Sequence, residues 1–118
     1  MDKADSKIVV LLTTFPNSDV ARSIAETLVR DGLAACVQLG AEVESMYFWR
    51  GEFCSEREVP CSIKTDSAAL EKLCKRLREL HPYECPQIVW GEVSASADYA
   101  QWARQCWAEN RRNEKSPE

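Results

Sequence analysis

Residues 81–86 hold the densest set of chemically capable side chains in this sequence. They include the single histidine of the 118-residue chain, His81, together with the phenol of Tyr83, the carboxylate of Glu84 and the thiol of Cys85. Imidazole and thiolate together suit copper or zinc. A histidine at the end of a helix also has a structural use, because the helix dipole favours it and its ring caps the last carbonyl groups. From the sequence, His81 is therefore either a ligand in a metal site or a cap at the end of a helix.

Enzymatic chemistry has little support in the residue pattern. A thiolate nucleophile needs a nearby base, and His81 with Cys36 or Cys85 is the one pairing that offers it. The chain contains no Gly-x-Ser-x-Gly elbow, no phosphate-binding glycine loop and no Cys-x-x-Cys pair. Lys64 lies at a strand end before a helix, where it is either part of an anion site or simply exposed to solvent. We therefore expect a protein that is not an enzyme.

Composition narrows the class of protein further. The net charge is −4 and the basic residues are scattered, which argues against a generic nucleic-acid binder. No apolar run approaches the ~20 residues of a membrane helix. The polar start of the chain does not resemble a secretory signal, so we expect a cytoplasmic protein whose six cysteines stay reduced.

Strand and helix patterns alternate along the chain without a linker. Helices are expected after Asn17, after Asp66 or Ser67, and after Ser96, since these residues are good N-caps. Gly32 is expected to end the first helix. Strands are expected over 7–14, 33–39, 43–49, 52–65 and 87–93, with a tight turn at residues 50–51 and an edge, end or bulge at Pro60.

This order of elements predicts the fold class. It matches an α+β, ferredoxin-like β-α-β-β-α-β sandwich with a long β-hairpin and an extra C-terminal helix. We expect a flexible N-terminus over residues 1–6, a single domain over 7–109 and a flexible, charged tail over 110–118.

The predicted hairpin is apolar on both of its faces. Alternation along the strand places Tyr47 and Trp49 on one side and Met46 and Phe48 on the other, and Phe53 adds a ring on the return strand. One layer of helices cannot cover both faces. We therefore expect the hairpin to be buried against another subunit.

Five segments together resemble the CutA divalent-cation tolerance family. They are Thr-Thr-Phe-Pro-Asn at 13–17, Leu-Ala-Ala-Cys-Val at 33–37, Ser-Met-Tyr-Phe-Trp-Arg-Gly at 45–51, Ile-Lys-Thr at 63–65 and His-Pro-Tyr-Glu-Cys-Pro at 81–86. Their order and spacing agree with the family across about residues 7 to 107. The resemblance implies a ferredoxin-like fold, a homotrimer similar to the PII signalling proteins, and a role in tolerance to divalent cations, copper above all.

The family's copper site transfers only in part to this chain. Members with a described site have a cysteine where this chain has Thr13 and a histidine where it has Leu80, so that His81 alone remains. Cys36 and Glu84 are candidates to replace the lost ligands. On this resemblance we expect His81, Cys36 and Glu84 to hold Cu²⁺ or another divalent cation.

The resemblance also implies a ligand cleft at the subunit interface. The expected cleft and interface residues are Thr14, Pro16, Tyr47, Trp49, Lys64 and Tyr83. A PII-like sensor or adaptor, acting through protein or small-ligand binding at this cleft, is the alternative function. No nucleic acid or membrane is expected among the partners.

Overall fold

The computed structural model describes the backbone of residues 6–115 and the side chains of residues 6–109. One antiparallel sheet has the strand order β2-β4-β1-β5, and β3 pairs with the far end of β4. The strands are β1 (Lys7–Phe15), β2 (Cys36–Leu39), β3 (Val43–Trp49), β4 (Glu52–Thr65) and β5 (Val89–Ser94). The helices are α1 (Ser18–Arg30), α2 (Leu70–Leu80) and α3 (Ala97–Lys115). This arrangement confirms the predicted ferredoxin-like α+β class.

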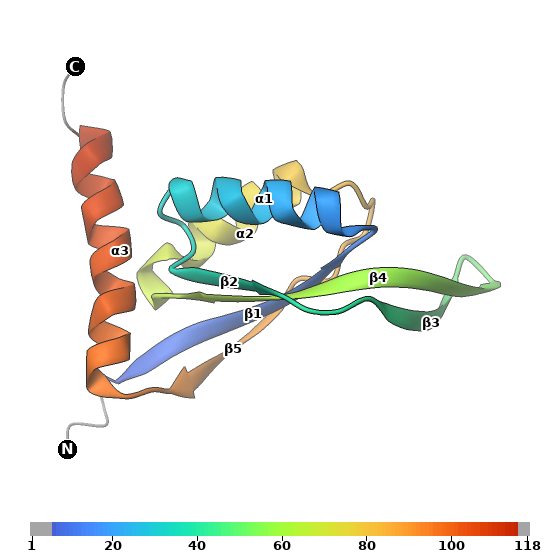
Figure 1. Cartoon of the computed structure of the whole chain (residues 1–118), viewed down its shortest axis with the longest axis horizontal. Helices are drawn as coiled ribbons and strands as arrows, with labels where there is room; N and C mark the ends of the chain where they lie inside the picture. Colours follow the sequence, from blue (N-terminus) through green and yellow to red (C-terminus); the bar gives the residue numbers. More distant parts are fainter. Residues whose placement is uncertain (1–5, 116–118) are drawn as a thin grey trace.

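The main hydrophobic core lies between the sheet and the helices α1 and α2, which cover one sheet face (Figure 1). Leu11 and Ile63 of the sheet, Leu28 of α1 and Leu77 of α2 are completely buried there. Successive strand residues face opposite sides, so every second residue of β1 enters this core. The helix α3 stands across the end of the sheet that lies away from the hairpin tip (Figure 1).

Local sequence signals account for the element boundaries. The Asn17 side chain accepts a hydrogen bond from the backbone N–H of Val20, which confirms it as the N-cap of α1. Gly32 ends the helix with φ 75°, where its N–H reaches the Val29 carbonyl. A glycine is favoured there because a side chain would strain the left-handed backbone.

The β3–β4 turn also follows the sequence prediction. Arg50 and Gly51 both have positive φ, 52° and 81°. Trp49 pairs with Glu52 across the turn. Two such residues form the tight turn whose twist matches that of a hairpin.

Pro60 lies within the central strand β4, and of the expected edge, end or bulge the structure has the bulge, because the pairs Leu39–Cys61 and Val43–Glu58 leave three residues, 40–42, facing two, 59–60. Its carbonyl accepts a hydrogen bond from the N–H of Gly40, 2.8 Å away. The N and O of one residue in an antiparallel strand point to the same neighbour, so the missing N–H of Pro60 faces residues 40–42. There β2 has ended and β3 has not begun, so the irregularity lies in the facing chain.

The structure describes part of each chain end that was predicted to be flexible. Ser6 is buried, and its carbonyl accepts a hydrogen bond from Ala95, so the folded part begins one residue earlier than expected. The segment from residue 110 is helical as far as Lys115, because its arginine, glutamate and lysine residues are good helix formers. Residues 1–5 and 116–118 of the predicted flexible ends lie outside the described residues.

The hairpin of β3 and the first part of β4 projects from the rest of the fold as an arm (Figure 1). It raises the radius of gyration to 15.7 Å, against about 13 Å for a compact globule of this length. Met46, Phe48 and Phe53 are 63%, 74% and 63% exposed. The described part of the chain contains no helix that is long and apolar enough to cross a membrane.

Candidate functional site

A cleft of about 670 Å³ separates the arm from the loop that follows α2. Its volume falls in the range of small-molecule sites. Its walls come from β1, from both strands of the arm and from the loop at 82–87. The lining residues are Thr14, Ser45, Met46, Tyr47, Trp49, Glu56, Glu58, Pro82, Tyr83, Glu84, Cys85 and Gln87.

A buried carboxylate forms the floor of the cleft. Glu58 is 8% exposed, and its Oε2 accepts a hydrogen bond from the Thr14 hydroxyl over 3.1 Å. The Tyr83 side chain is hydrogen-bonded to the same carboxylate. Burial raises the pKa of Tyr83 far above its usual value, and the hydrogen bond and charge of Glu58 add to this shift. The Tyr83 hydroxyl therefore stays protonated and donates to Glu58.

His81 lies beside this floor and is 7% exposed. Its Nε2 is 2.9 Å from the carbonyl oxygen of Thr14 and 3.1 Å from the Thr13 hydroxyl. Its Nδ1 accepts a hydrogen bond from the backbone N–H of Tyr83 over 3.3 Å. The ring stacks on Phe15 with the centroids 4.7 Å apart.

These contacts assign the protonation state of His81. A carbonyl oxygen only accepts, so Nε2 carries the hydrogen, and Nδ1 must keep its lone pair for the N–H of Tyr83. Burial lowers the pKa of His81 below its usual value, which agrees with a neutral ring. Both ring nitrogens are thus engaged within the chain, and the histidine ties the end of β1 to the loop that carries Tyr83.

The three metal ligands predicted from the sequence do not come together within one chain. Cys36 lies on β2 opposite Lys64, and Glu84 is exposed and forms an ion pair with Arg50. Among the described side chains there is no group of three or more His, Cys, Asp or Glu residues placed to hold a metal ion. Because the nitrogens of His81 are also occupied, these residues do not fit a copper ion as a set.

The predicted cleft residues are placed together in part. Thr14, Tyr47, Trp49 and Tyr83 all line the cleft. Pro16 follows β1 at the start of the turn to α1 and does not line it. Lys64 lies on β4 and donates a hydrogen bond to the side chain of Gln38.

An ion pair spans the rim of the cleft. The Arg50 guanidinium at the tip of the arm is 2.7 Å from the Glu84 carboxylate in the loop. The same guanidinium lies over the Trp49 ring, 5.1 Å from its centroid. A cation is therefore already held there between an aromatic face and a carboxylate.

Glu56 and Glu58 are the acidic cleft residues that the sequence prediction missed. The position of the turn at residues 50–51 was enough to predict which face of the hairpin these two glutamates share. It sets the register Tyr47 to Cys54 and Ser45 to Glu56, and directly paired residues share a face of the hairpin. Glu56 and Glu58 consequently lie on the same face as Tyr47.

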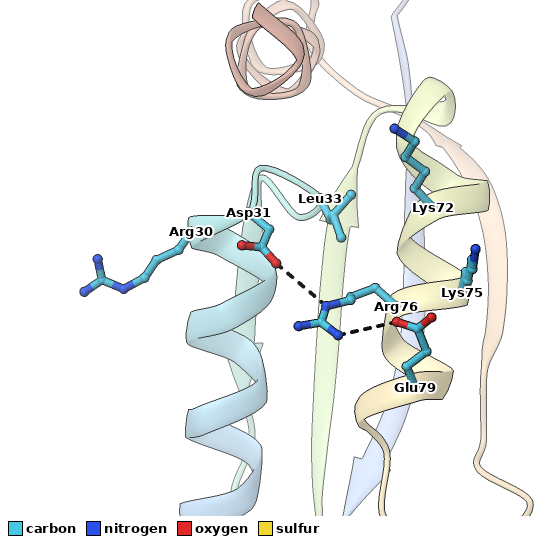
Figure 2. Close-up of a pocket in the computed structure, with 7 residues that line it drawn as sticks. All are labelled: Arg30, Asp31, Leu33, Lys72, Lys75, Arg76 and Glu79. Carbon is cyan, nitrogen blue, oxygen red and sulfur yellow. Dashed lines mark hydrogen bonds and ion pairs between the residues drawn. The ribbon is translucent and has the colours of Figure 1, made fainter. Parts of the chain in front are cut away.

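A second cavity of about 460 Å³ lies between the end of α1 and α2. Four of its lining residues are basic: Arg30, Lys72, Lys75 and Arg76. Figure 2 shows that Arg30 points away from the groove, whereas Arg76 reaches across it toward Asp31. These cations do not converge on one point, as the side chains of an anion site would.

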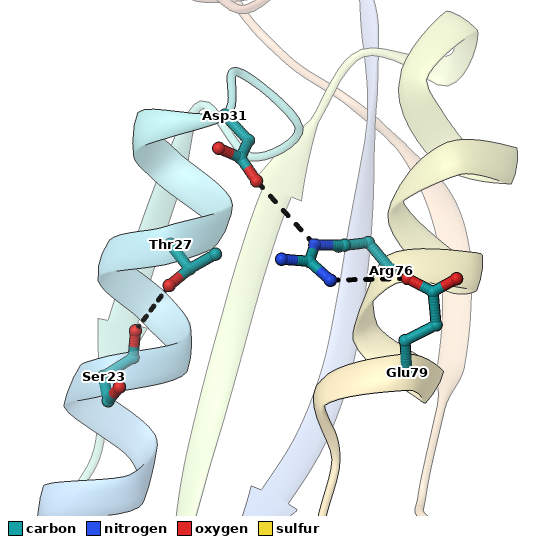
Figure 3. Close-up of polar contacts among 5 residues, drawn as sticks. All are labelled: Ser23, Thr27, Asp31, Arg76 and Glu79. Carbon is teal, nitrogen blue, oxygen red and sulfur yellow. Dashed lines mark hydrogen bonds and ion pairs between the residues drawn. The ribbon is translucent and has the colours of Figure 1, made fainter.

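Ion pairs account for Arg76 in this groove. Its guanidinium lies 3.8 Å from Asp31 and 3.4 Å from Glu79, which joins the end of α1 to α2 (Figure 3). On α1 itself the Thr27 hydroxyl donates to the Ser23 carbonyl (Figure 3). We interpret this cavity as a solvated seam between two helices, and the cleft at the arm as the candidate site.

The fold and the cleft define a class of protein. The chain is a small ferredoxin-like α+β protein with an acidic and aromatic cleft, and it carries an exposed apolar arm beside that cleft. Comparison with known proteins agrees with this class and narrows it. A family model described as "CutA1 divalent ion tolerance protein" matches residues 9–106. The chain belongs to this family.

Individual relatives support the assignment. The divalent-cation tolerance protein CutA of Thermus thermophilus is 39% identical over 97 residues, which make up 81% of this chain and 94% of that protein. Protein CutA of Homo sapiens is 39% identical over 93 residues, which make up 78% of this chain and 52% of the human protein. The crystal structure of CutA1 from Shewanella sp. SIB1 superposes with a TM-score of 0.80 at 35% identity, covering 84% of this chain and 94% of that one.

Proposed function

We propose that this protein serves divalent-cation tolerance in the cytoplasm as a non-enzymatic homotrimer whose cleft at the arm binds the ligand. The observation that carries the proposal is the charge of the cleft. Glu56, Glu58 and Glu84 line it, and none of the described residues that line it is basic. Such a site attracts cations. The family is named for tolerance to divalent ions and not for a reaction.

The homotrimer accounts for the exposed arm. Phe48 and Phe53 pack edge to face at its tip, with their ring centroids 5.8 Å apart, and leave most of their surface in solvent. Exposed apolar clusters of this kind mark contact surfaces. A neighbouring subunit would cover the face with Phe48 and Phe53, and the opposite face with Tyr47 would remain turned to the cleft.

The cytoplasmic location is proposed from the cysteines. All six are free thiols, and one of them, Cys85, is exposed on the rim of the cleft. Thiols persist in a reducing compartment.

For the cation we propose electrostatic attraction by the cleft carboxylates, with the ion keeping its own water shell. Hard divalent cations retain water readily and prefer carboxylate oxygens. This arrangement needs no set of three coordinating side chains. It also gives His81 a supporting role, in which its ring holds the loop that carries Tyr83.

Native mass spectrometry of the reduced protein tests assembly and ion binding together. For wild type we expect the mass of three subunits, and for Phe48→Ser a shift to smaller species. Val29→Ser is the control and should keep the trimer mass, because Val29 is also an exposed apolar residue but lies on α1 and not on the arm. Mn²⁺ is the probe because it prefers oxygen ligands to thiolates. It should bind to wild type and to His81→Ala with similar affinity, and more weakly to Glu56→Gln. A monomeric wild type contradicts the trimer. Loss of Mn²⁺ from an intact His81→Ala trimer contradicts the carboxylate site.

The sensor or adaptor remains the second candidate, because the cleft has the volume and the aromatic walls of a small-molecule site. In that case metal binding would be incidental. Binding of a ligand or partner that persists in the presence of a chelator would favour it.

A further inference from the structure

We propose that the cleft binds a small organic cation of the alkylammonium class, held between the rings of Tyr47 and Trp49 and the carboxylates of Glu56 and Glu58. This inference rests on the proposed role of the cleft as the ligand site and names a ligand class beyond metal ions.

The first argument is the buried charge of Glu58. Buried carboxylates in proteins are usually paired with a cation, because hydrogen bonds alone replace only part of the lost hydration. Thr14 and Tyr83 donate hydrogen bonds to Glu58, but neither carries a positive charge. Within residues 6–109, no lysine or arginine forms an ion pair with Glu58 or with Glu56. The countercharge is therefore left for a ligand.

The second argument is the aromatic wall. Tyr47 and Trp49 are two residues apart on β3, so they share one face of the arm, and both line the cleft. They are 42% and 40% exposed, less than Phe48 and Phe53 on the opposite face. Aromatic faces attract organic cations through the ring quadrupole, and they contribute apolar contact that a hydrated metal ion cannot use.

The third argument is that Arg50 already shows this recognition in the structure. Its guanidinium lies over the Trp49 ring and pairs with Glu84, so an organic cation is held at the mouth of the cleft by an aromatic face and a carboxylate. Arg50 enters from the rim and leaves Glu56 and Glu58 unpaired. An ammonium ligand would likewise lie between an aromatic face and a carboxylate, but inside the cleft, beside Tyr47, Glu56 and Glu58.

The spacing of the carboxylates favours a ligand with two ammonium groups. Glu56 and Glu58 lie two residues apart on one face of β4, about 7 Å along the strand. A short diamine can place one ammonium near each carboxylate. A metal ion coordinated directly by side chains would instead need ligands that converge on one point, and the described side chains provide no such group of three, so the cleft suits a metal ion only in hydrated form.

Isothermal titration calorimetry of the reduced full-length protein with putrescine tests the proposal. The matched probes are n-butylamine, which has one charge, and the uncharged diol of the same chain length. We expect putrescine to bind about tenfold more tightly than n-butylamine, and the diol to give no binding heat. Putrescine binding should weaken as salt is added, because salt screens the carboxylates.

Variants of the arm locate the site. Glu56→Gln should weaken putrescine binding about tenfold. Glu44→Gln is its control, because Glu44 is also exposed on the arm but points to the opposite face. Arg50→Gln should tighten binding, since it frees Glu84 and opens the mouth. Arg57→Gln removes the same charge from a residue paired with Glu42 and should leave the affinity unchanged.

The outcomes separate this inference from the proposed function. Equal binding of the diol, or equal losses in Glu56→Gln and Glu44→Gln, overturns the cation site. Binding of Mn²⁺ without putrescine overturns the alkylammonium ligand and leaves the proposed function standing. Absence of binding by both probes overturns both. Glu56 is exposed, so its variant tests the site without the risk of misfolding that replacing buried Glu58 carries.

Discussion

His81→Phe tests the structural role that the geometry gives to the single histidine. Phenylalanine keeps a ring that can stack on Phe15, but it removes the bond to the Thr14 carbonyl and the acceptor for the Tyr83 N–H. Leaving a buried polar group without its partner costs about 1–3 kcal/mol. Because two groups are affected and one of the bonds is long, we expect the free energy of unfolding to fall by about 2–4 kcal/mol.

The pH dependence of this loss is a sharper test. Burial lowers the pKa of His81 in the folded state below its usual value of 6.5. As the pH falls below 6.5, the unfolded chain takes up the proton first, so wild type loses stability while His81→Phe has no such group to titrate. The difference in stability between the two proteins should therefore be largest above pH 6.5 and should shrink below it.

Urea denaturation at about pH 8 and about pH 5, on either side of the usual histidine pKa, measures both effects. Both proteins are compared at the same subunit concentration, because the stability of an oligomer depends on it. A variant as stable as wild type, or a difference that grows at the lower pH, would refute the assignment of a neutral, doubly hydrogen-bonded ring.

Three further substitutions test the fold. Leu77→Ala, at a completely buried position, should lower the free energy of unfolding by about 2–5 kcal/mol in the same urea assay; a loss below that of a surface change would contradict the core described for α2. Gly51→Ala, at φ 81°, should cost about 1 kcal/mol by thermal unfolding, since the left-handed backbone is strained for any side chain. Gly40→Ala places a Cβ 3.0 Å from Cγ of Pro60, so we expect a loss of about 1 kcal/mol. Adding Pro60→Ala should relieve that loss in a double-mutant cycle.

Much of the fold could be predicted from the sequence because its signals are local. Asn17 is confirmed as the N-cap of α1, and Asp66 caps the short 3-10 turn Ser67–Ala69 that leads into α2. The turn at residues 50–51 is also confirmed, and it determines the register of the whole arm. For Pro60 the sequence left an edge, an end or a bulge open, and the structure has the bulge; the choice depends on the facing chain, some twenty residues away in sequence.

The candidate site was predictable only in part. Residues 81–86 were recognised as chemically dense, and Tyr47, Trp49 and Tyr83 do line the cleft. Glu58 was missed because it looks like any exposed glutamate of a hairpin strand, and its burial depends on Thr14 and Tyr83 from two distant segments.

The sequence by itself determined the order of elements, the turns, the two-sided apolar arm and the family, because these follow from residue type and spacing along the chain. Only the tertiary structure decided which atoms face one another. It placed the Thr14 carbonyl and the Tyr83 N–H on the two nitrogens of His81, and left Glu58 buried without a countercharge among the described residues. Hydrogen bonding and charge compensation act over a few ångströms, and such contacts between distant segments exist only once the chain has folded.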